Sequence, residues 1–358
     1  MEAKSVAALP EGPGWQYEPK WDGFRCLAWR AGVAVTLTAK SGKPLARYFP
    51  EVVALLRGLP LERFLLDGEL VVPLEGKLSF DALQQRLHPA ESRVRRLAAE
   101  TPASLLLFDC LLDPEGGSLL AEPLSARRAA LERLYRALPA PGDEGPGDEG
   151  PAGEGPRLRL SPATRELSEA RAWLQEAGGA LDGVVAKRLE APYRPGERAM
   201  LKVKCLRTAD CVVGGFRYAA EGKDKGDAKG GGKGLVGSLL LGLHDGEGRL
   251  HHVGFTSGLA AKDKPALTRR LEALVEPPGF TGKAPGGPSR WASARDAEWQ
   301  PLRPELVVEV RYDQVTGDRF RHGTRLLRWR LDKAPRQCTF EQLERAARPE
   351  ELERLWGR

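Results

Sequence analysis

The residues with the clearest chemical potential lie near the start of the chain, in the run Glu18-Pro19-Lys20-Trp21-Asp22-Gly23-Phe24-Arg25. The amine of Lys20 can attack a phosphorus atom and hold the transferred group as a phosphoramidate, which divides one difficult transfer into easier steps. A free lysine has a pKa of about 10.4, so nearby cations, a metal ion or desolvation must first disfavour its charged form. A surface turn that opens a hairpin has the same pattern, so the motif alone does not decide the matter.

Four later segments place polar residues inside apolar, strand-like runs. Burying a carboxylate in such a run is costly unless it is paired or faces a site, and a paired core carboxylate is a serious alternative for Asp109. In the last segment, alternation with period two puts both lysines on one face of the strand. The segments are Phe64 to Val72 with Asp67 and Glu69, Ser104 to Leu112 with Phe108 and Asp109, Leu181 to Lys187 with Asp182, and Leu201 to Cys205 with Lys202 and Lys204.

Together these segments resemble the ordered motifs of ATP-dependent DNA ligases. The motifs are Glu-x-Lys-x-Asp-Gly-x-Arg, Asp-Gly-Glu, Phe-Asp, acid-Gly-Val-Val-x-Lys and Lys-x-Lys, and they span residues 18 to 204. The most similar type is the small bacterial two-domain ligase, which stands alone or forms the ligase module of larger end-joining proteins. A chance explanation must account for five elements in sequence, which makes the ordered set far more specific than any one motif.

The resemblance implies a role for each residue that matches a motif. Lys20 would be the nucleophile that carries AMP, with Asp22 from the same motif, and Lys202 and Lys204 would face the α-phosphate as further catalytic residues. Those two cations would also lower the pKa of Lys20 by like-charge repulsion. The residues implied to bind ATP in this part of the chain are Glu18 near the adenine amino group, Arg25 and Glu69 at the ribose, Phe108 stacked on the adenine, Lys40 and Lys187.

Glu69 and Asp182 are the residues implied to hold a divalent ion, Mg²⁺ or Mn²⁺, while Arg25 and Lys40 would also contact DNA phosphates. Three positions depart from the family pattern. Lys40 replaces the usual arginine, which loses a bidentate contact. Asp182 replaces a glutamate, and Met200 stands where an aromatic residue is usual.

Length and composition agree with an intracellular two-domain protein. At 358 residues the chain is too long for one typical core. It has no apolar run of about 18 residues for a membrane span, and its start lacks the apolar core of a signal peptide. Its five cysteines are scattered without a Cys-x-x-Cys pair, so neither a disulfide framework nor a zinc site is indicated. We expect a cytoplasmic protein associated with the nucleoid.

Charge is distributed unevenly between the two parts of the chain. Residues 1 to 204 hold 28 basic and 28 acidic residues, so the whole excess of +6 lies in residues 205 to 358. This C-terminal part should therefore attract a polyanion, although a solvated surface is the ordinary explanation of a charged run. Its densest basic stretch resembles the closing motif of these ligases. We expect Arg321, Arg325 and Arg328 to contact DNA, and the resemblance implies that Arg330 and Lys333 orient the pyrophosphate leaving group.

The pattern of elements predicts an α+β nucleotidyltransferase domain at 1–204 and a C-terminal OB-fold domain at 205–358 that ends in a helix. Before residue 204, strand-like runs alternate with amphipathic stretches at 47–59, 79–98, 125–138 and 163–177. Segment 139–156 lacks apolar residues and predicts a disordered insertion. Beyond 204, five strand-like runs at 211–213, 235–243, 250–255, 306–310 and 326–331, with a helix at 263–275, favour an OB-fold. The glycine-rich segment 226–234 lacks the Ser or Thr of a P-loop.

These observations predict an ATP-dependent DNA ligase that repairs nicked or broken duplex DNA. We expect it to act as a monomer without a membrane partner, with any further repair activity supplied in trans. An RNA ligase or a guanylyltransferase would use the same lysine, and formation of an adduct from ATP or GTP would separate them. A non-catalytic OB-fold protein that binds nucleic acid would form no adduct.

Overall fold

The computed structural model describes residues 1–74, 77–138, 157–176, 181–219, 234–286 and 298–343. The predicted insertion 139–156, most of the glycine-rich segment and the predicted C-terminal helix lie outside these ranges. The chain divides into two compact units between Cys205 and Leu206. In the described ranges, no helix is both long enough and apolar enough to cross a membrane.

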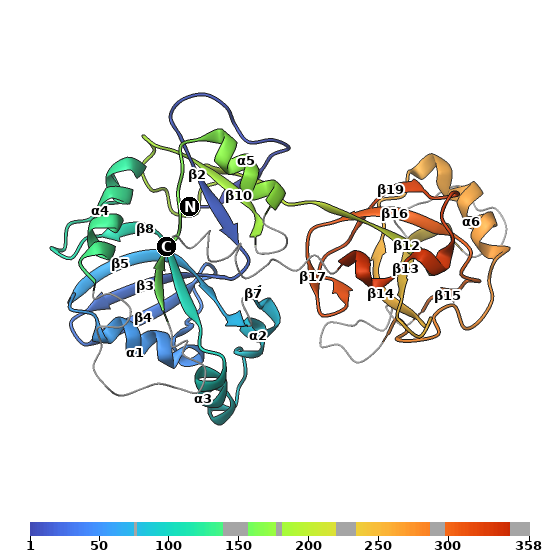
Figure 1. Cartoon of the computed structure of the whole chain (residues 1–358), viewed down its shortest axis with the longest axis horizontal. Coiled ribbons are helices and arrows are strands. Elements are labelled where there is room, and N and C mark those ends of the chain that lie inside the picture. The colour runs from blue at the N-terminus through green and yellow to red at the C-terminus, as the bar shows by residue number, and fades with distance from the viewer. Residues whose placement is uncertain (75–76, 139–156, 177–180, 220–233, 287–297, 344–358) are drawn as a thin grey trace. The chain divides into compact units, whose positions relative to one another are not determined.

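The first unit contains a four-stranded sheet that carries the Lys20 motif (Figure 1). Strand β2 lies at the edge of this sheet and contains Pro19. Proline has no N–H to donate to a neighbouring strand, so it is tolerated at a sheet edge. Along β2, Trp15, Tyr17 and Trp21 are core residues, and the alternation puts Glu18 and Lys20 on the opposite face. The strands, in spatial order, are β1 Ala3–Ser5, β11 Met200–Lys204, β10 Leu181–Arg188 and β2 Trp15–Trp21.

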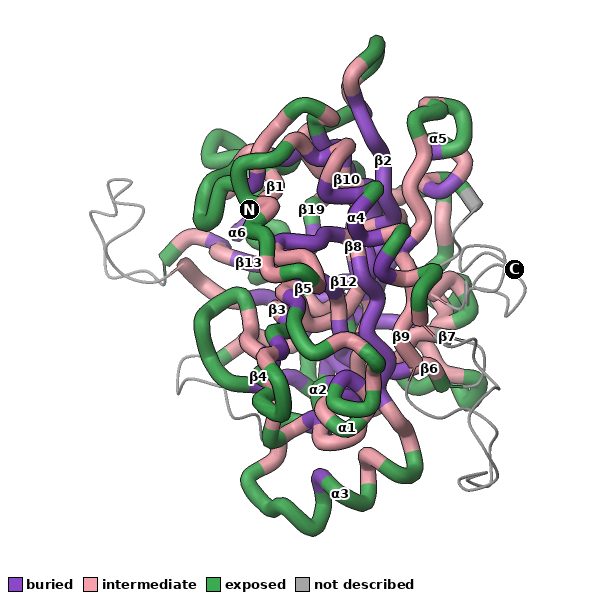
Figure 2. The backbone as a smooth tube through the Cα atoms, turned by 90° about the vertical axis from the view of Figure 1, so that its left-hand side faces the viewer, coloured by how far each residue is buried: buried purple, intermediate pink, exposed green. Residues whose placement is uncertain are grey.

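A five-stranded sheet forms the other half of this unit. Strand β8 is purple over most of its length in Figure 2, as its nearly continuous apolar sequence predicts for a strand buried on both faces. Leu105 and Leu107 belong to the core of this sheet, whereas Leu106 packs in the core of the four-stranded sheet. The spatial order is β4 Ala34–Ala39, β3 Phe24–Ala31, β5 Arg63–Val71, β8 Ser104–Leu112 and β9 Leu158–Leu160.

Helices cover the outer faces of both sheets. Helix α1 packs on β4, α4 packs on β8, and α5 packs on β10 and β2. The predicted helical stretch 79–98 forms two helices, because His88 precedes Pro89 and a residue before proline disfavours helical geometry. The helical and short elements are η1 Ala46–Tyr48, α1 Pro50–Gly58, β6 Pro73–Leu74, β7 Lys77–Leu78, α2 Phe80–Gln85, α3 Glu91–Glu100, α4 Leu124–Arg136 and α5 Leu167–Glu176.

The second unit is a partly closed barrel of five main strands. In spatial order these are β14 Leu250–Thr256, β13 Val236–His244, β12 Arg207–Tyr218, β16 Val307–Tyr312 and β19 Arg325–Trp329. The sheet curls back on itself where Thr324 donates its backbone N–H to the carbonyl of Phe255 at 3.1 Å. A helix that lies between β14 and β16 in the sequence, α6 Lys264–Glu272, completes the expected OB-fold arrangement, which confirms the predicted fold class.

Two strands of this barrel differ in length from their predictions. The predicted 211–213 is the centre of the twelve-residue β12, and β19 ends at Trp329, so Arg330 lies beyond it. The remaining elements are η2 Ala261–Asp263, α6 Lys264–Glu272, β15 Gln300–Pro301, β17 Val315–Thr316, β18 Arg319–Phe320, η4 Pro335–Gln337 and η5 Phe340–Leu343.

Candidate active site

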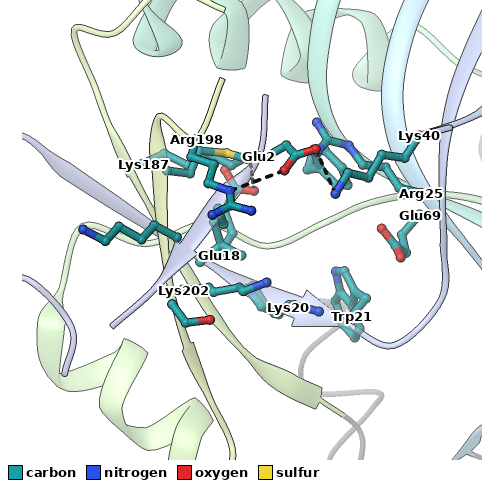
Figure 3. Close-up of a pocket in the computed structure, with 17 residues that line it drawn as sticks. Glu2, Glu18, Lys20, Trp21, Arg25, Lys40, Glu69, Lys187, Arg198 and Lys202 are labelled. Atoms are coloured by element: carbon teal, nitrogen blue, oxygen red, sulfur yellow. Dashed lines mark ion pairs between the residues drawn. The ribbon is translucent and has the colours of Figure 1, made fainter. Parts of the chain in front are cut away.

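A cavity of about 620 Å³ lies in the first unit, between its two sheets (Figure 3). Strands of the four-stranded sheet supply one wall, and β3, β5 and β8 supply the other. The structure thus brings together predicted site residues that are as much as 184 positions apart in the sequence, from Glu18 to Lys202. The predicted site residues that line it are Glu18, Lys20, Arg25, Lys40, Glu69, Phe108, Lys187 and Lys202.

Strand register places the lysines of the first wall in neighbouring rows. Lys20 on β2 lies opposite Gly183 on β10, and Gly183 lies opposite Lys204 on β11. In the next row, Glu18, Val185 and Lys202 correspond in the same way. Directly opposite residues share a face of a sheet, so these rows point to the cavity side. The predicted common face of Lys202 and Lys204 is therefore confirmed, although the cavity lining includes only Lys202.

Asp182 reaches Lys20 because β10 is irregular at this point. The register between β10 and β2 shifts between Leu181 and Gly183, as in a β-bulge, which can redirect a side chain that regular alternation would place on the other face. The carboxylate of Asp182 forms an ion pair with the amine of Lys20. Gly183 is required here, since a Cβ on it would lie 2.0 Å from the carbonyl oxygen of Val203. The bulge thus holds an acid against the proposed nucleophile.

Glu18 is buried under the cavity with both carboxylate oxygens in use. Lys187 contacts Oε2 at 2.6 Å, and the amide of Gln16 donates to Oε1 at 2.8 Å. The Lys187 ammonium also lies 4.7 Å from the ring centroid of Phe108, within the range of a cation–π interaction. Sequence reasoning missed Gln16, although its position two residues before Glu18 on the same strand face was a usable signal.

The second wall presents Phe108, Arg25 and Glu69. Phe108 lies where the register between β5 and β8 shifts, so it too sits at an irregularity next to the cavity. Arg25 makes a bidentate contact with the fully buried Asp67, at 3.0 and 2.6 Å, and lies directly opposite Glu69 on β5. Asp67 therefore meets the requirement that a buried carboxylate be paired, and it holds the Arg25 guanidinium at the cavity wall.

Burial shifts the pKa of two groups in the cavity. It raises the pKa of Glu69 to about 8, against the opposing effect of the Lys20 and Arg25 cations. Burial also lowers the pKa of Lys202, and the charges of Lys20 and Lys204 act in the same direction. The cavity therefore combines a carboxyl group that titrates near neutrality with cations that repel one another.

Lys40 lies at the mouth of the cavity and is largely exposed. Its ammonium contacts Glu2 at 3.0 Å, and Arg198 approaches the same carboxylate at 3.9 Å (Figure 3). Sequence reasoning missed both Glu2 and Arg198, which come from a segment before the first motif and from the stretch before β11. Three predicted site residues of the described part of this unit are not in the cavity lining: Asp22, Asp182 and Lys204.

Oxygen donors for a divalent ion are present but sparse. The described residues include no cluster of three or more His, Cys, Asp or Glu side chains that could hold a metal. Mg²⁺ usually takes only one or two protein carboxylates and completes its shell with water and substrate phosphates. Asp182 forms an ion pair with Lys20, and the charge of Lys20 acts on Glu69. These two carboxylates near Lys20 fit a magnesium site of that kind.

The predicted basic residues of the second unit are mostly paired with acids. Arg330 and Lys333 both contact Asp210, each at 2.8 Å, and Arg328 contacts Glu309 at 2.5 Å. Two further predicted residues differ from these: Arg321 donates to the hydroxyl of Thr316 at 2.8 Å, and Arg325 is exposed on β19 opposite Arg311.

Two protein-family models and several curated relatives match this chain. Residues 2–204 match the ATP dependent DNA ligase domain, and residues 232–333 match the ATP dependent DNA ligase C terminal region. The chain is 44% identical to DNA ligase C2 of Mycolicibacterium smegmatis and 42% identical to DNA ligase C of Mycobacterium tuberculosis, in each case over 96% of this chain and 93% of the relative.

A solved Lig E DNA ligase shares the fold, with a TM-score of 0.50 and 17% identity over 92% of this chain and all of that chain. The resemblance found in the sequence motifs is confirmed. With the two family models covering most of the sequence and the relatives covering nearly all of it, the chain belongs to the ATP-dependent DNA ligase family.

Proposed function

We propose that this protein seals nicks or breaks in duplex DNA with ATP, through a covalent intermediate in which Lys20 carries AMP. The observation that carries the proposal is the register of β2, β10 and β11. It gathers Lys20, Lys202 and Lys204 on one face, beside a cavity large enough for a nucleotide. Such an arrangement suits phosphoryl transfer, which depends on positioning and charge neutralisation.

The reaction has three steps, each a displacement at phosphorus. The lone pair of the Lys20 amine forms a bond to the α-phosphorus of ATP, and the bond to pyrophosphate breaks. A 5′-phosphate of the DNA then displaces the Lys20 amine and takes AMP, which restores the free lysine. Finally the adjacent 3′-hydroxyl forms the new phosphodiester bond and AMP leaves.

Residues of both walls supply the contacts for these steps. We propose that Phe108 stacks on the adenine, that Glu18, held by Gln16 and Lys187, accepts from the adenine amino group, and that Arg25 and Lys40 contact the ribose or phosphates. Lys202 and Lys204 neutralise charge at the α-phosphate. Asp182 and Glu69 would hold Mg²⁺ or Mn²⁺, which would stabilise negative charge on phosphate oxygens.

We further propose a division of labour between the domains. Residues 1–204 form the adenylation domain and residues 205–358 the OB-fold domain, where Arg321, Arg325 and Arg328 contact DNA and Arg330 and Lys333 act at the leaving pyrophosphate. For those last two residues to do so, the phosphates would have to compete with Asp210. The protein would work as a monomer in the cytoplasm, at the nucleoid, with other repair activities supplied in trans.

One experiment tests the proposal directly. The purified chain is incubated with labelled ATP and Mg²⁺, the labelled protein is isolated, and nicked duplex DNA is added. We expect label on Lys20, its transfer to the DNA, and a sealed strand. Parallel arms with GTP and with a nicked RNA duplex test the other nucleotidyltransferases. An adduct formed from GTP alone, sealing of RNA alone, or no adduct would overturn the proposal.

A further inference from the structure

Behind Phe108, two carboxylates face each other across neighbouring strands. Asp67 on β5 lies directly opposite Asp109 on β8, and both are buried. Like charges in directly opposite positions destabilise a sheet. Each carboxylate therefore needs its own cation. Because Phe108 is next to Asp109 on β8, the position of Phe108 depends on how Asp109 is paired.

Two arginines meet the requirement from different sides. Arg25 binds Asp67 at the cavity wall, as described above. Arg127, on α4 and 1% exposed, binds Asp109 with its Nε at 2.8 Å and its Nη2 at 3.1 Å. The planar arginine fork matches a carboxylate in a way that a lysine ammonium does not. Arg127 thereby fixes the strand position next to Phe108 from outside the cavity.

Tyr193 links this network to the other wall. Its hydroxyl donates to Oδ2 of Asp67 at 2.8 Å and accepts from Arg25 at 3.3 Å, while its ring lies 5.7 Å from the guanidinium of Arg127. Tyr193 follows β10, the strand of Lys187, and packs in a small core cluster with Met200 of β11 and Leu111 of β8. That cluster joins strands of the two sheets between which the cavity lies.

Arg127 also holds the segment that carries Tyr193. Its Nη1 donates to the carbonyl of Ala191 at 3.0 Å and to that of Glu122 at 2.7 Å. One buried side chain therefore binds β8 through Asp109 and the segment after β10 through Ala191. A change in either contact would alter the distance between the strand of Phe108 and the strand of Lys187.

We propose that Arg127 and Tyr193 are positioning residues, which set the separation of the two cavity walls and hold Phe108 where it can stack on the nucleotide base. Neither residue lines the cavity. This inference rests on the proposed function, in which Lys20 takes AMP from ATP inside this cavity. In addition, residues that lie behind the wall formed by β3, β5 and β8, and that do not touch the nucleotide, control the affinity for it.

The test compares variants in single-turnover adenylation of Lys20, measured over a range of ATP concentrations. Tyr193→Phe keeps the ring and removes only the hydroxyl. We expect a rise of roughly tenfold in the half-saturating ATP concentration, in line with loss of a hydrogen bond to a charged group, and a smaller change in maximal rate. Arg127→Lys should have a larger effect, because it loses the fork that binds Asp109.

Two controls separate positioning from simple loss of stability. Tyr135→Phe removes a tyrosine hydroxyl that donates to the carbonyl of Leu158 at 3.3 Å, away from the cavity. Arg86→Lys alters another buried arginine, which pairs with Glu51 at 2.8 Å. Both controls should leave the half-saturating ATP concentration unchanged, with thermal unfolding measured for all four proteins so that variants are compared well below their melting temperatures.

A double-mutant cycle tests the route of the effect. If Tyr193 acts through Phe108, then Tyr193→Phe should raise the half-saturating concentration much less in a Phe108→Leu background than in the wild type. Additive effects, or a Tyr193→Phe variant that matches Tyr135→Phe, would overturn the positioning role while leaving the proposed function intact. A wild-type protein that forms no AMP adduct would instead overturn the proposed function itself.

Discussion

The two units hold their basic residues in different ways. In the first unit, which has no net charge in the sequence, Lys20, Lys202 and Arg25 converge on one cavity, and two of them, Lys20 and Arg25, are also paired there with buried acids. In the second unit, which carries the whole net charge, Arg328 and Arg330 are each balanced by a neighbouring acid. Net charge therefore says little about where an anion binds, because pairing and burial decide how strongly each cation can attract one.

The largest effect is expected at the cavity nucleophile. Lys20→Ala should reduce formation of the AMP adduct by at least roughly 10³-fold, as for other residues that form the covalent intermediate. Lys20→Arg is the matched control, since it keeps the positive charge and cannot act as the same nucleophile. Both variants should still join a chemically pre-adenylated nick to a measurable extent. Adduct at the wild-type level in either variant, detected by mass spectrometry, would place the nucleophile elsewhere.

Removing the cation from a buried ion pair of the first unit should destabilise the protein much more than removing the cation from an exposed ion pair of the second unit. Lys187→Met leaves Glu18 buried without its cation, which should cost about 3–5 kcal/mol in the free energy of unfolding. Arg328→Met removes a cation from an exposed pair with Glu309, and should cost less than about 1 kcal/mol. Denaturant unfolding of both variants measures the difference. Equal costs would show that burial does not distinguish the two units.

A third expected effect is a pH dependence of the free energy of unfolding that comes from one cavity residue, Glu69. Because burial raises the pKa of Glu69 to about 8 from an unfolded value of 4.5, the folded state binds this proton more tightly than the unfolded state. The stabilising contribution is therefore complete below about pH 4.5 and is lost as the pH rises through about 8.

Glu69→Gln tests this sign. The variant should lose less stability than the wild type between pH 5 and about pH 8, in denaturant unfolding at a series of pH values. Glu62→Gln is the matched control, because Glu62 is exposed on the segment before β5 and should leave the pH profile unchanged. A wild-type profile that is flat over this range, or that rises, would contradict the assignment.

The sequence was sufficient for the motifs but not for their geometry. Alternation along residues 201–205 correctly predicted that Lys202 and Lys204 share a face of β11, because period two is a local property of a strand. The position of Asp182 was not accessible in this way, since it depends on a register shift between β10 and β2 that only the paired strands reveal.

Pairing between distant residues was the second limit. The sequence left open whether Asp109 was a paired core carboxylate, and its partner Arg127 lies on a helix 18 positions later with no motif around it. In the second unit, the density of arginines indicated a DNA surface, but Asp210 and Glu309, 120 and 19 positions from their partners, were not visible as counter-charges. Long-range pairing of this kind follows from the fold and not from local pattern.

The smallest expected effect is on DNA binding by two arginines of β19, Arg325 and Arg328, which differ in whether an acid in the described part of the chain pairs with them. Arg325 is exposed and lies directly opposite Arg311, so the two like charges repel each other and would both gain from a phosphate nearby. Arg325→Gln should therefore weaken binding to nicked DNA and reduce the salt dependence by about one phosphate contact. Arg328→Gln should change both quantities less, because Glu309 already balances Arg328. Titrations at several salt concentrations measure both slopes, and a larger loss for Arg328→Gln would show that DNA displaces Glu309 and uses Arg328 in preference to Arg325.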